Sequence, residues 1–158
     1  MQHIVLILCL KILEKKEQVA SVIKQARMIT NYIYNQNWLL AKMHETCKGD
    51  IIRPRLTRSA TNYLALDSLV KKKVGLKQLF TSDDWAGHKY STSKVGQKVE
   101  MIVLDHIFWD QAQKVCELFE PLYKLLRIVD INVYQTIGAM YELMRIVRGE
   151  LEKKYGAK

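Results

Sequence analysis

Glycine and proline are scarce in this chain, which limits the folds that it can adopt. Seven Gly and two Pro occur among 158 residues, too few for the many turns of a β-sandwich or barrel. Apolar residues recur instead at helical spacing, for example at Val19, Val22, Ile23 and Ala26. With 49% apolar and 26% charged residues, the composition is that of one folded domain or of part of a larger one. The sequence therefore predicts a mainly α fold.

The same periodicity predicts where the helices lie. They are expected, in chain order, over residues 17–47 with a break near 35–37, over 59–73, over 74–80, over 99–128 with Pro121 kinking or splitting the helix, and over 133–155. Residues 48–55 are expected to form a loop, and the polar, basic residues 87–97 an exposed loop. Small polar residues at 81–84 are expected to cap a turn that holds Trp85.

The chain starts with a short, fully apolar run over residues 4–10. This run is far too short to cross a bilayer. No basic segment precedes it and no small-x-small cleavage site follows it, so a signal peptide is not expected. A buried strand or a helix turn is the ordinary interpretation of such a run.

Positive charge is concentrated in the middle of the chain. The net charge is +9, from 25 Lys and Arg against 16 Asp and Glu. Residues 48–98 hold 11 basic and 4 acidic side chains, whereas residues 99–158 hold 8 and 9. Such a segment suits a surface that faces a polyanion, although an ordinary solvated basic face has the same composition.

The cysteines and carboxylates do not suggest a catalytic or metal site. Three cysteines without a C-x-x-C pair indicate reduced thiols in a reducing compartment. His44 and Cys47 form a lone H-x-x-C without a second ligand pair, so no zinc site is expected. Capping is favoured over catalysis for Asp83 and Asp84. Asp105 and His106 are neighbours on a predicted helix and therefore point apart. No small-molecule substrate is indicated.

One cluster has the chemistry of a phosphate-binding surface. Residues 53–63 read RPRLTRSATNY, and their arginines, hydroxyls and amide can contact a nucleic-acid backbone. Three lysines at 71–73 follow at a helix end, where they interact favourably with the helix dipole and can also touch phosphate. The predicted nucleic-acid-binding residues are Arg53, Arg55, Thr57, Arg58, Asn62, Lys71, Lys72 and Lys73.

This cluster resembles the R-P-x-x-T-R-[F/W]-A-T-N-[F/Y] stretch of plant hAT-superfamily transposase-like proteins. The resemblance covers residues 17–150, and its motifs occur in the same order. The other matching motifs are Tyr32-Ile33-Tyr34-Asn35, Leu79-Phe80-Thr81-Ser82 with Trp85, Lys94 with Gly96, Val103-Leu104-Asp105 with Phe108-Trp109, Glu120-Pro121-Leu122, and Leu126-Arg127-Ile128-Val129-Asp130.

The resemblance implies a helical fragment of an RNase-H-like domain with the start of its helical insertion. The intact family cleaves and transfers DNA strands with three acidic residues and divalent metal ions. None of the acids in this chain matches those positions, so neither cleavage activity nor a cofactor is expected. The resemblance therefore implies a truncated, non-catalytic remnant with residual nucleic-acid binding in the nucleus. The alternative is a helical DNA-binding or interaction module domesticated from a transposase.

One residue departs from the family motif inside the basic cluster. Ser59 stands where the family has an aromatic residue that would stack near an extruded base. Serine cannot supply the ~1–3 kcal/mol that base stacking on an aromatic ring provides. Any DNA contact at this cluster is therefore expected to rest on the arginines.

The apolar start has a second interpretation once the family is considered. The family would place C-A-A-H-C-[I/L]-D-L-M-L-E-D-I-G-K just before Glu17. Codons chosen for residues 1–15, read from the third nucleotide, encode A-A-H-C-I-D-L-M-L-E-D-I-G-K. We therefore expect residues 1–16 to be an out-of-frame leader that forms no domain, with the partial transposase-like region over 17–158. Because the family's sheet is missing, we also expect exposed apolar helix faces, which would leave the chain partly unfolded or self-associating.

Overall fold

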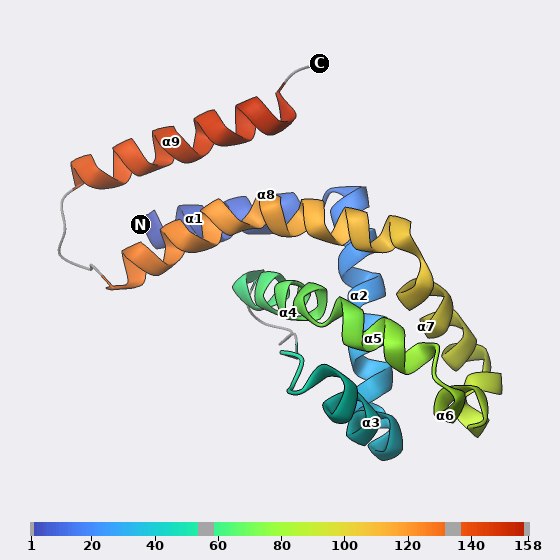
Figure 1. Cartoon of the computed structure of the whole chain (residues 1–158). Helices are drawn as coiled ribbons and strands as arrows, with labels where there is room; N and C mark the ends of the chain where they lie inside the picture. Colours follow the sequence, from blue (N-terminus) through green and yellow to red (C-terminus); the bar gives the residue numbers. More distant parts are fainter. Residues whose placement is uncertain (1, 54–58, 132–136, 157–158) are drawn as a thin grey trace.

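The computed structural model describes residues 2–53, 59–131 and 137–156 (Figure 1). Every regular element in these ranges is helical, which confirms the predicted mainly α fold. The elements are α1 (Gln2–Glu14), α2 (Glu17–Asn35), α3 (Asn37–Cys47), α4 (Ser59–Lys71), α5 (Lys73–Phe80), α6 (Asp83–Ala86), the 3-10 turn η1 (Lys89–Thr92), α7 (Lys94–Leu104), α8 (His106–Ile131) and α9 (Ile137–Tyr155). None of the helices described is long and apolar enough to cross a membrane.

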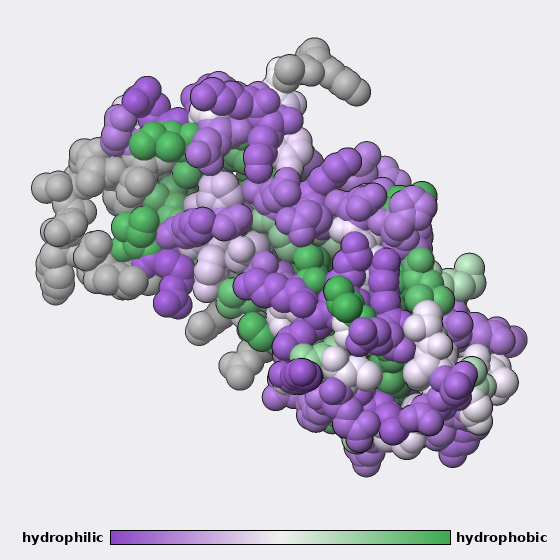
Figure 2. All heavy atoms as spheres, viewed as in Figure 1, coloured by the Kyte–Doolittle hydropathy of each residue, from purple (hydrophilic) through white to green (hydrophobic). Residues whose placement is uncertain are grey.

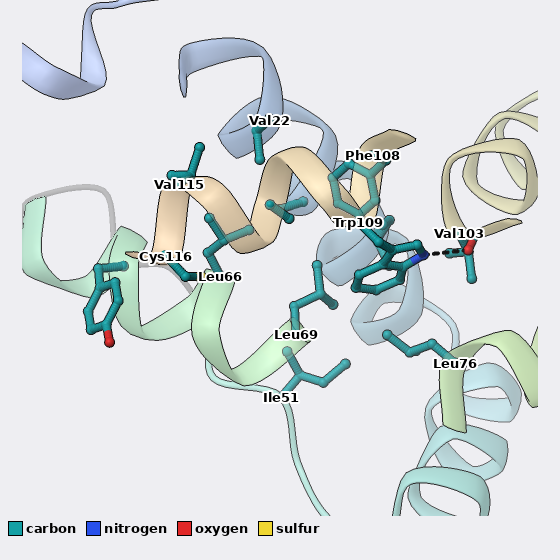
Figure 3. Close-up of a cluster of buried hydrophobic side chains, with 14 of the residues drawn as sticks. Val22, Ile51, Leu66, Leu69, Leu76, Val103, Phe108, Trp109, Val115 and Cys116 are labelled. Carbon is teal, nitrogen blue, oxygen red and sulfur yellow. Dashed lines mark hydrogen bonds between the residues drawn. The ribbon is translucent and has the colours of Figure 1, made fainter. Parts of the chain in front are cut away.

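Helix α8 is the central element of the fold. It packs against α1, α4, α2, α7 and α9, while α3 packs mainly against α5 and α2 (Figure 1). Its buried side chains face those of α4 and α2 in one continuous apolar core (Figure 3). Hydrophilic side chains cover most of the face seen in Figure 2, with smaller apolar areas between them. Burial of each large apolar side chain contributes about 1.5–3 kcal/mol, so this core is the main source of stability.

The apolar run at the start of the chain forms helix α1 and not a strand. Leu6 and Leu10 are completely buried in the core, whereas Ile4, Leu8 and Ile12 lie on the opposite, exposed face. Helix α1 packs on α8 and α4. This packing does not bear on the reading frame, so the out-of-frame origin stays a prediction. The coding DNA tests this prediction: the codons for residues 1–16, read from the third nucleotide, should encode the family's segment.

The predicted break near residues 35–37 is confirmed. Gln36 has an extended backbone, with φ −120° and ψ 103°, between the end of α2 and the start of α3. The predicted capped turn is also confirmed, because the Ser82 hydroxyl accepts a hydrogen bond from the backbone N–H of Trp85.

The predicted helix over 99–128 breaks at Asp105, and α8 continues through Pro121. Asp105 is extended, and its carboxylate accepts a 2.9 Å hydrogen bond from the N–H of Ile107 at the start of α8. The indole N–H of Trp109 donates to the carbonyl of Val103 at 2.7 Å across this corner (Figure 3). A capping carboxylate and a buried indole therefore determine the corner, while Pro121 does not split α8.

The expectation of an exposed loop over 87–97 is also wrong. Residues 89–92 form η1, and α7 begins at Lys94 after Ser93, whose hydroxyl caps the N–H of Gly96. Gly96 is buried, and a Cβ there would lie 2.0 Å from the carbonyl oxygen of Tyr90. The close approach of η1 to α7 therefore requires glycine at this position.

Candidate nucleic-acid interface

Arg53 is the one arginine of the predicted cluster within the described residues. Its side chain is exposed, with the guanidinium 4.8 Å from the centre of the Tyr34 ring. The segment before it is anchored on both sides. The Tyr34 hydroxyl donates to the carbonyl of Ile51 at 2.7 Å, and the N–H of Ile52 donates to the Ser68 hydroxyl at 3.1 Å. Arg53 therefore follows a segment that is fixed between α2 and α4, and its guanidinium lies over the Tyr34 ring.

Arg55, Thr57 and Arg58 lie outside the described residues, so their predicted role remains a prediction. Helix α4 begins at Ser59, directly after them.

The Tyr34 hydroxyl, which is bonded to Ile51, stays neutral. Burial raises the pKa of this hydroxyl, and the charge of Asp50 raises it further. That hydroxyl therefore remains a neutral donor that holds the segment in place.

Asn62 makes hydrogen bonds within the protein at both ends of its amide. Its oxygen accepts from Arg27 at 2.7 Å, and its nitrogen donates to Glu14 at 3.1 Å. These bonds join α4 to α2 and α1. They favour a structural role for Asn62, and its predicted contact with DNA remains a prediction.

The three consecutive lysines have different surroundings. Lys71 forms a 2.7 Å ion pair with Asp67 one turn earlier, and this hydrogen bond raises the pKa of the Lys71 ammonium. Lys72 donates to the carbonyl of Cys47 at 2.9 Å and thereby caps the end of α3. Lys73, at the start of α5, is half-buried. The structure therefore gives Lys71 and Lys72 intramolecular partners that compete with phosphate.

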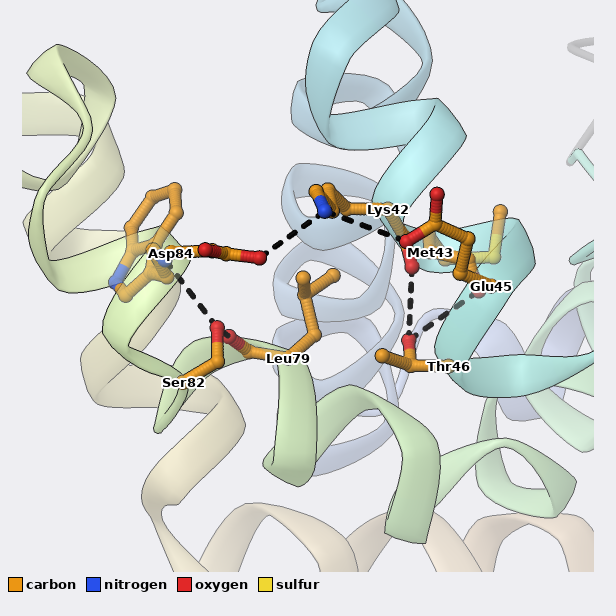
Figure 4. Close-up of polar contacts among 8 residues, drawn as sticks. Lys42, Met43, Glu45, Thr46, Leu79, Ser82 and Asp84 are labelled. Carbon is orange, nitrogen blue, oxygen red and sulfur yellow. Dashed lines mark hydrogen bonds and ion pairs between the residues drawn. The ribbon is translucent and has the colours of Figure 1, made fainter.

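The carboxylates singled out in the sequence belong to the framework. Asp84 forms an ion pair with Lys42 at 3.0 Å, and Lys42 also contacts Glu45 (Figure 4). Asp105 caps α8, as described above. Within the described ranges, no three His, Cys, Asp or Glu side chains are grouped so that they could hold a metal ion. His44 contacts Asp50, whereas Cys47 is buried, and burial raises the pKa of its thiol.

The structure brings together three aromatic rings that sequence reasoning did not group. The Trp38 and His88 rings stack with their centres 3.8 Å apart and their planes 11° apart. The Tyr90 ring lies 4.5 Å from His88 and 6.4 Å from Trp38. We call these three residues the aromatic patch. Helical spacing indicates only a packing role for Trp38. It could not group Trp38 with His88 and Tyr90, because these two residues lie about 50 positions later in the sequence.

A scan against protein-family models, a search of curated proteins and a search of solved structures each found no match.

Proposed function

We propose that this protein is a non-catalytic remnant of a hAT-type DNA transposase that retains nucleic-acid binding and acts in the nucleus. The ordered motifs within residues 17–150 support the transposase origin. In this proposal the helices correspond to part of an RNase-H-like domain and the start of its helical insertion.

The observation that carries the binding function is the charge of residues 48–98, with 11 basic against 4 acidic side chains. The exposed Arg53, on its anchored segment, provides one fixed contact for a phosphate. Arg55 and Arg58 follow within five residues in the sequence, and arginine side chains can form bidentate contacts with phosphate. Contacts of this kind hold a nucleic acid without reading its sequence.

The absence of catalysis in this proposal rests on the resemblance, which assigns none of the chain's acids to the three catalytic positions. Asp84 and Asp105 are used in an ion pair and a helix cap. Incubation of the purified protein with supercoiled plasmid and Mg²⁺ or Mn²⁺ is expected to leave the plasmid intact. Metal-dependent cleavage that copurifies with the protein would overturn this part of the proposal.

A second candidate function is that of an interaction module, and the outer face of α1 favours it. Ile4, Leu8 and Ile12 occur at four-residue spacing and are 59%, 50% and 63% exposed. An apolar stripe of this kind is typical of a surface that contacts another protein chain.

The binding function is tested with a fluorescently labelled DNA duplex at low salt. The protein is expected to bind, and the triple variant Arg53→Ala, Arg55→Ala, Arg58→Ala to bind substantially more weakly. A matched triple variant removes the same charge from α9, by Arg145→Ala, Arg148→Ala and Lys153→Ala. It is expected to bind DNA much more tightly than the triple variant of the arginine cluster. No binding by the wild-type protein would reject the binding function, and equal losses in both variants would reject the assigned site.

A further inference from the structure

The aromatic patch is fixed in position by hydrogen bonds on several sides. The His88 ring nitrogen Nδ1 accepts from the N–H of Tyr90 at 3.3 Å. The Tyr32 hydroxyl contacts the carbonyl of Tyr90 at 3.4 Å and the Ser93 hydroxyl at 3.2 Å. Together with the close approach at Gly96, these contacts hold η1 against α2 and α7. A ligand that stacks on these rings therefore loses little binding energy to ordering them.

The aromatic rings of the patch are only partly covered, although Trp38 and Tyr90 also pack against the core. Trp38, His88 and Tyr90 are each half-buried, in contrast to the completely covered rings of the core. Trp38 extends from the first turn of α3, so the patch is formed where α3 meets η1. Partly exposed, preorganised aromatic rings provide flat surfaces on which a planar ligand can stack.

One lysine lies at the edge of the patch. The Lys89 ammonium lies 5.5 Å from the centre of the Tyr90 ring, and Lys89 is exposed. Lys94 and Lys98 are also exposed, but they lie on the side of α7 turned away from Gly96, the residue that faces Tyr90. No acidic residue occurs between positions 85 and 99. The ligand that fits this surface is therefore planar and carries negative charge.

We propose that the aromatic patch binds single-stranded nucleic acid by stacking on unpaired bases, while Lys89 contacts a phosphate. This inference rests on the proposed nucleic-acid binding and assigns it a second site, separate from the arginine cluster. Stacked aromatic rings beside basic residues are the usual means of binding single strands without sequence preference. A duplex is a poorer ligand because its base faces are covered by neighbouring bases.

Tryptophan fluorescence reports directly on this site. The chain has three tryptophans. Trp85 and Trp109 are each 1% exposed, and their indole N–H groups donate to Glu100 and to the carbonyl of Val103. Trp38 is therefore the tryptophan that a stacked base can reach, and quenching by a bound strand is assigned to it.

The experiment titrates the full chain with oligothymidine at low salt and follows both tryptophan quenching and the anisotropy of a labelled strand. We expect quenching, and a loss of affinity of roughly 5- to 150-fold in Trp38→Leu. Trp38→Phe should retain most of the affinity. Tyr141→Leu removes an exposed aromatic on α9, which is 76% exposed, and should leave affinity unchanged.

The outcomes distinguish this inference from the proposed function. Two results would reject the aromatic patch as the binding site and leave the proposed nucleic-acid binding intact. They are binding of oligothymidine without quenching, and full affinity in Trp38→Leu. Failure of the wild-type protein to bind either single strands or duplex would overturn both. Binding of inorganic polyphosphate with equal affinity would show that charge alone acts, and would also overturn the patch.

A further variant keeps the test valid if Trp38→Leu fails to fold. Lys89→Ala changes an exposed side chain on η1 and should not affect folding. This variant is expected to weaken oligothymidine binding. It should also reduce the slope of log affinity against log salt concentration by about one, the loss of one phosphate contact. Unchanged affinity and unchanged salt dependence in this variant would contradict the proposed phosphate contact.

Discussion

At the start of α4, the amide of Asn62 joins three helices. It accepts from Arg27 of α2 and donates to Glu14 of α1. Both partners are charged, and hydrogen bonds to charged groups are stronger than those between neutral groups. The contribution of Asn62 to stability is therefore expected to exceed that of an ordinary surface amide.

We predict that Asn62→Ala lowers the free energy of unfolding by about 1–2 kcal/mol, because the two charged groups lose a shared partner. Asn31→Ala is the matched control, since Asn31 is an exposed amide within α2. Urea denaturation of the three proteins measures the difference. Equal stability of the two variants would contradict the bridging role.

A second prediction concerns Cys116, whose thiol is buried between α8 and α4. Burial raises the pKa of Cys116 from 9.0 to about 12. A raised folded-state pKa means that the thiol's contribution to stability is fully present below pH 9 and is lost as the pH rises toward 12. Burial likewise raises the pKa of Tyr63 from 10.0 to about 12, so its contribution is lost over the range 10 to 12.

The urea midpoint is therefore expected to fall as the pH rises from 9 to 11. Cys116→Val removes the thiol but keeps an apolar side chain, so its midpoint should fall less steeply over the same range. Parallel pH profiles for the wild-type protein and the variant would show that the thiol does not titrate as described.

At the scale of elements, Gly75 sets the close packing of α5 against α3. A Cβ at this position would lie 2.8 Å from the carbonyl oxygen of Thr46 and 2.8 Å from the Cys47 sulfur. The backbone oxygen cannot move without disturbing the end of α3. Gly75 therefore allows a contact between two helices that any larger residue would separate.

We predict that Gly75→Ala destabilises the protein by about 1–3 kcal/mol, since the two helices must move apart. Gly149→Ala in α9 is the control, because nothing lies within 4 Å of its Cβ position. This second substitution should stabilise α9 by up to about 1 kcal/mol through the higher helix propensity of alanine. Thermal unfolding of both variants checks the two signs, and a neutral or stabilising Gly75→Ala would contradict the packing.

The positions of the helices could be predicted from the sequence, but several ends could not. Helical spacing identifies α2, α3 and α4, and the Ser82 cap follows from local chemistry. The corner at Asp105 depends on the Trp109 bond to Val103, and the start of α7 depends on the Ser93 cap and on space at Gly96. Neither the bond at the corner nor the space at Gly96 is visible in the helical spacing, and α8 continues through Pro121.

The basic nature of the candidate site could likewise be predicted, but not the surroundings of each cation. The excess charge of residues 48–98 follows from counting. Lys72 caps α3 and Asn62 bridges three helices only because the fold brings distant partners to them. The aromatic patch joins Trp38 to residues about 50 positions later, so only the fold could reveal it.

At the scale of the whole molecule, α1 has one face in the core and one face exposed. Leu6 and Leu10 are covered by the other helices, and Ile4, Leu8 and Ile12 are not. The exposed Lys11 lies beside this stripe on α1. Such a surface favours association with another apolar surface, including a second copy of the chain.

We therefore predict self-association that strengthens with protein concentration in sedimentation velocity experiments. The triple variant Ile4→Gln, Leu8→Gln, Ile12→Gln should shift the protein toward the monomer. The control changes three exposed apolar residues elsewhere, Val74→Gln, Val95→Gln and Met101→Gln. A wild-type protein that remains monomeric at all concentrations, with a sharp cooperative melt, would contradict this prediction.

The salt dependence of duplex binding tests the central claim most directly. For a protein that neutralises phosphates, the logarithm of affinity falls linearly with the logarithm of salt concentration. We predict a steep slope for the wild-type protein, reduced by about one unit for each lost contact when Arg53, Arg55 and Arg58 become alanine. A flat slope, or the same slope in the triple variant, would contradict nucleic-acid binding through this basic segment.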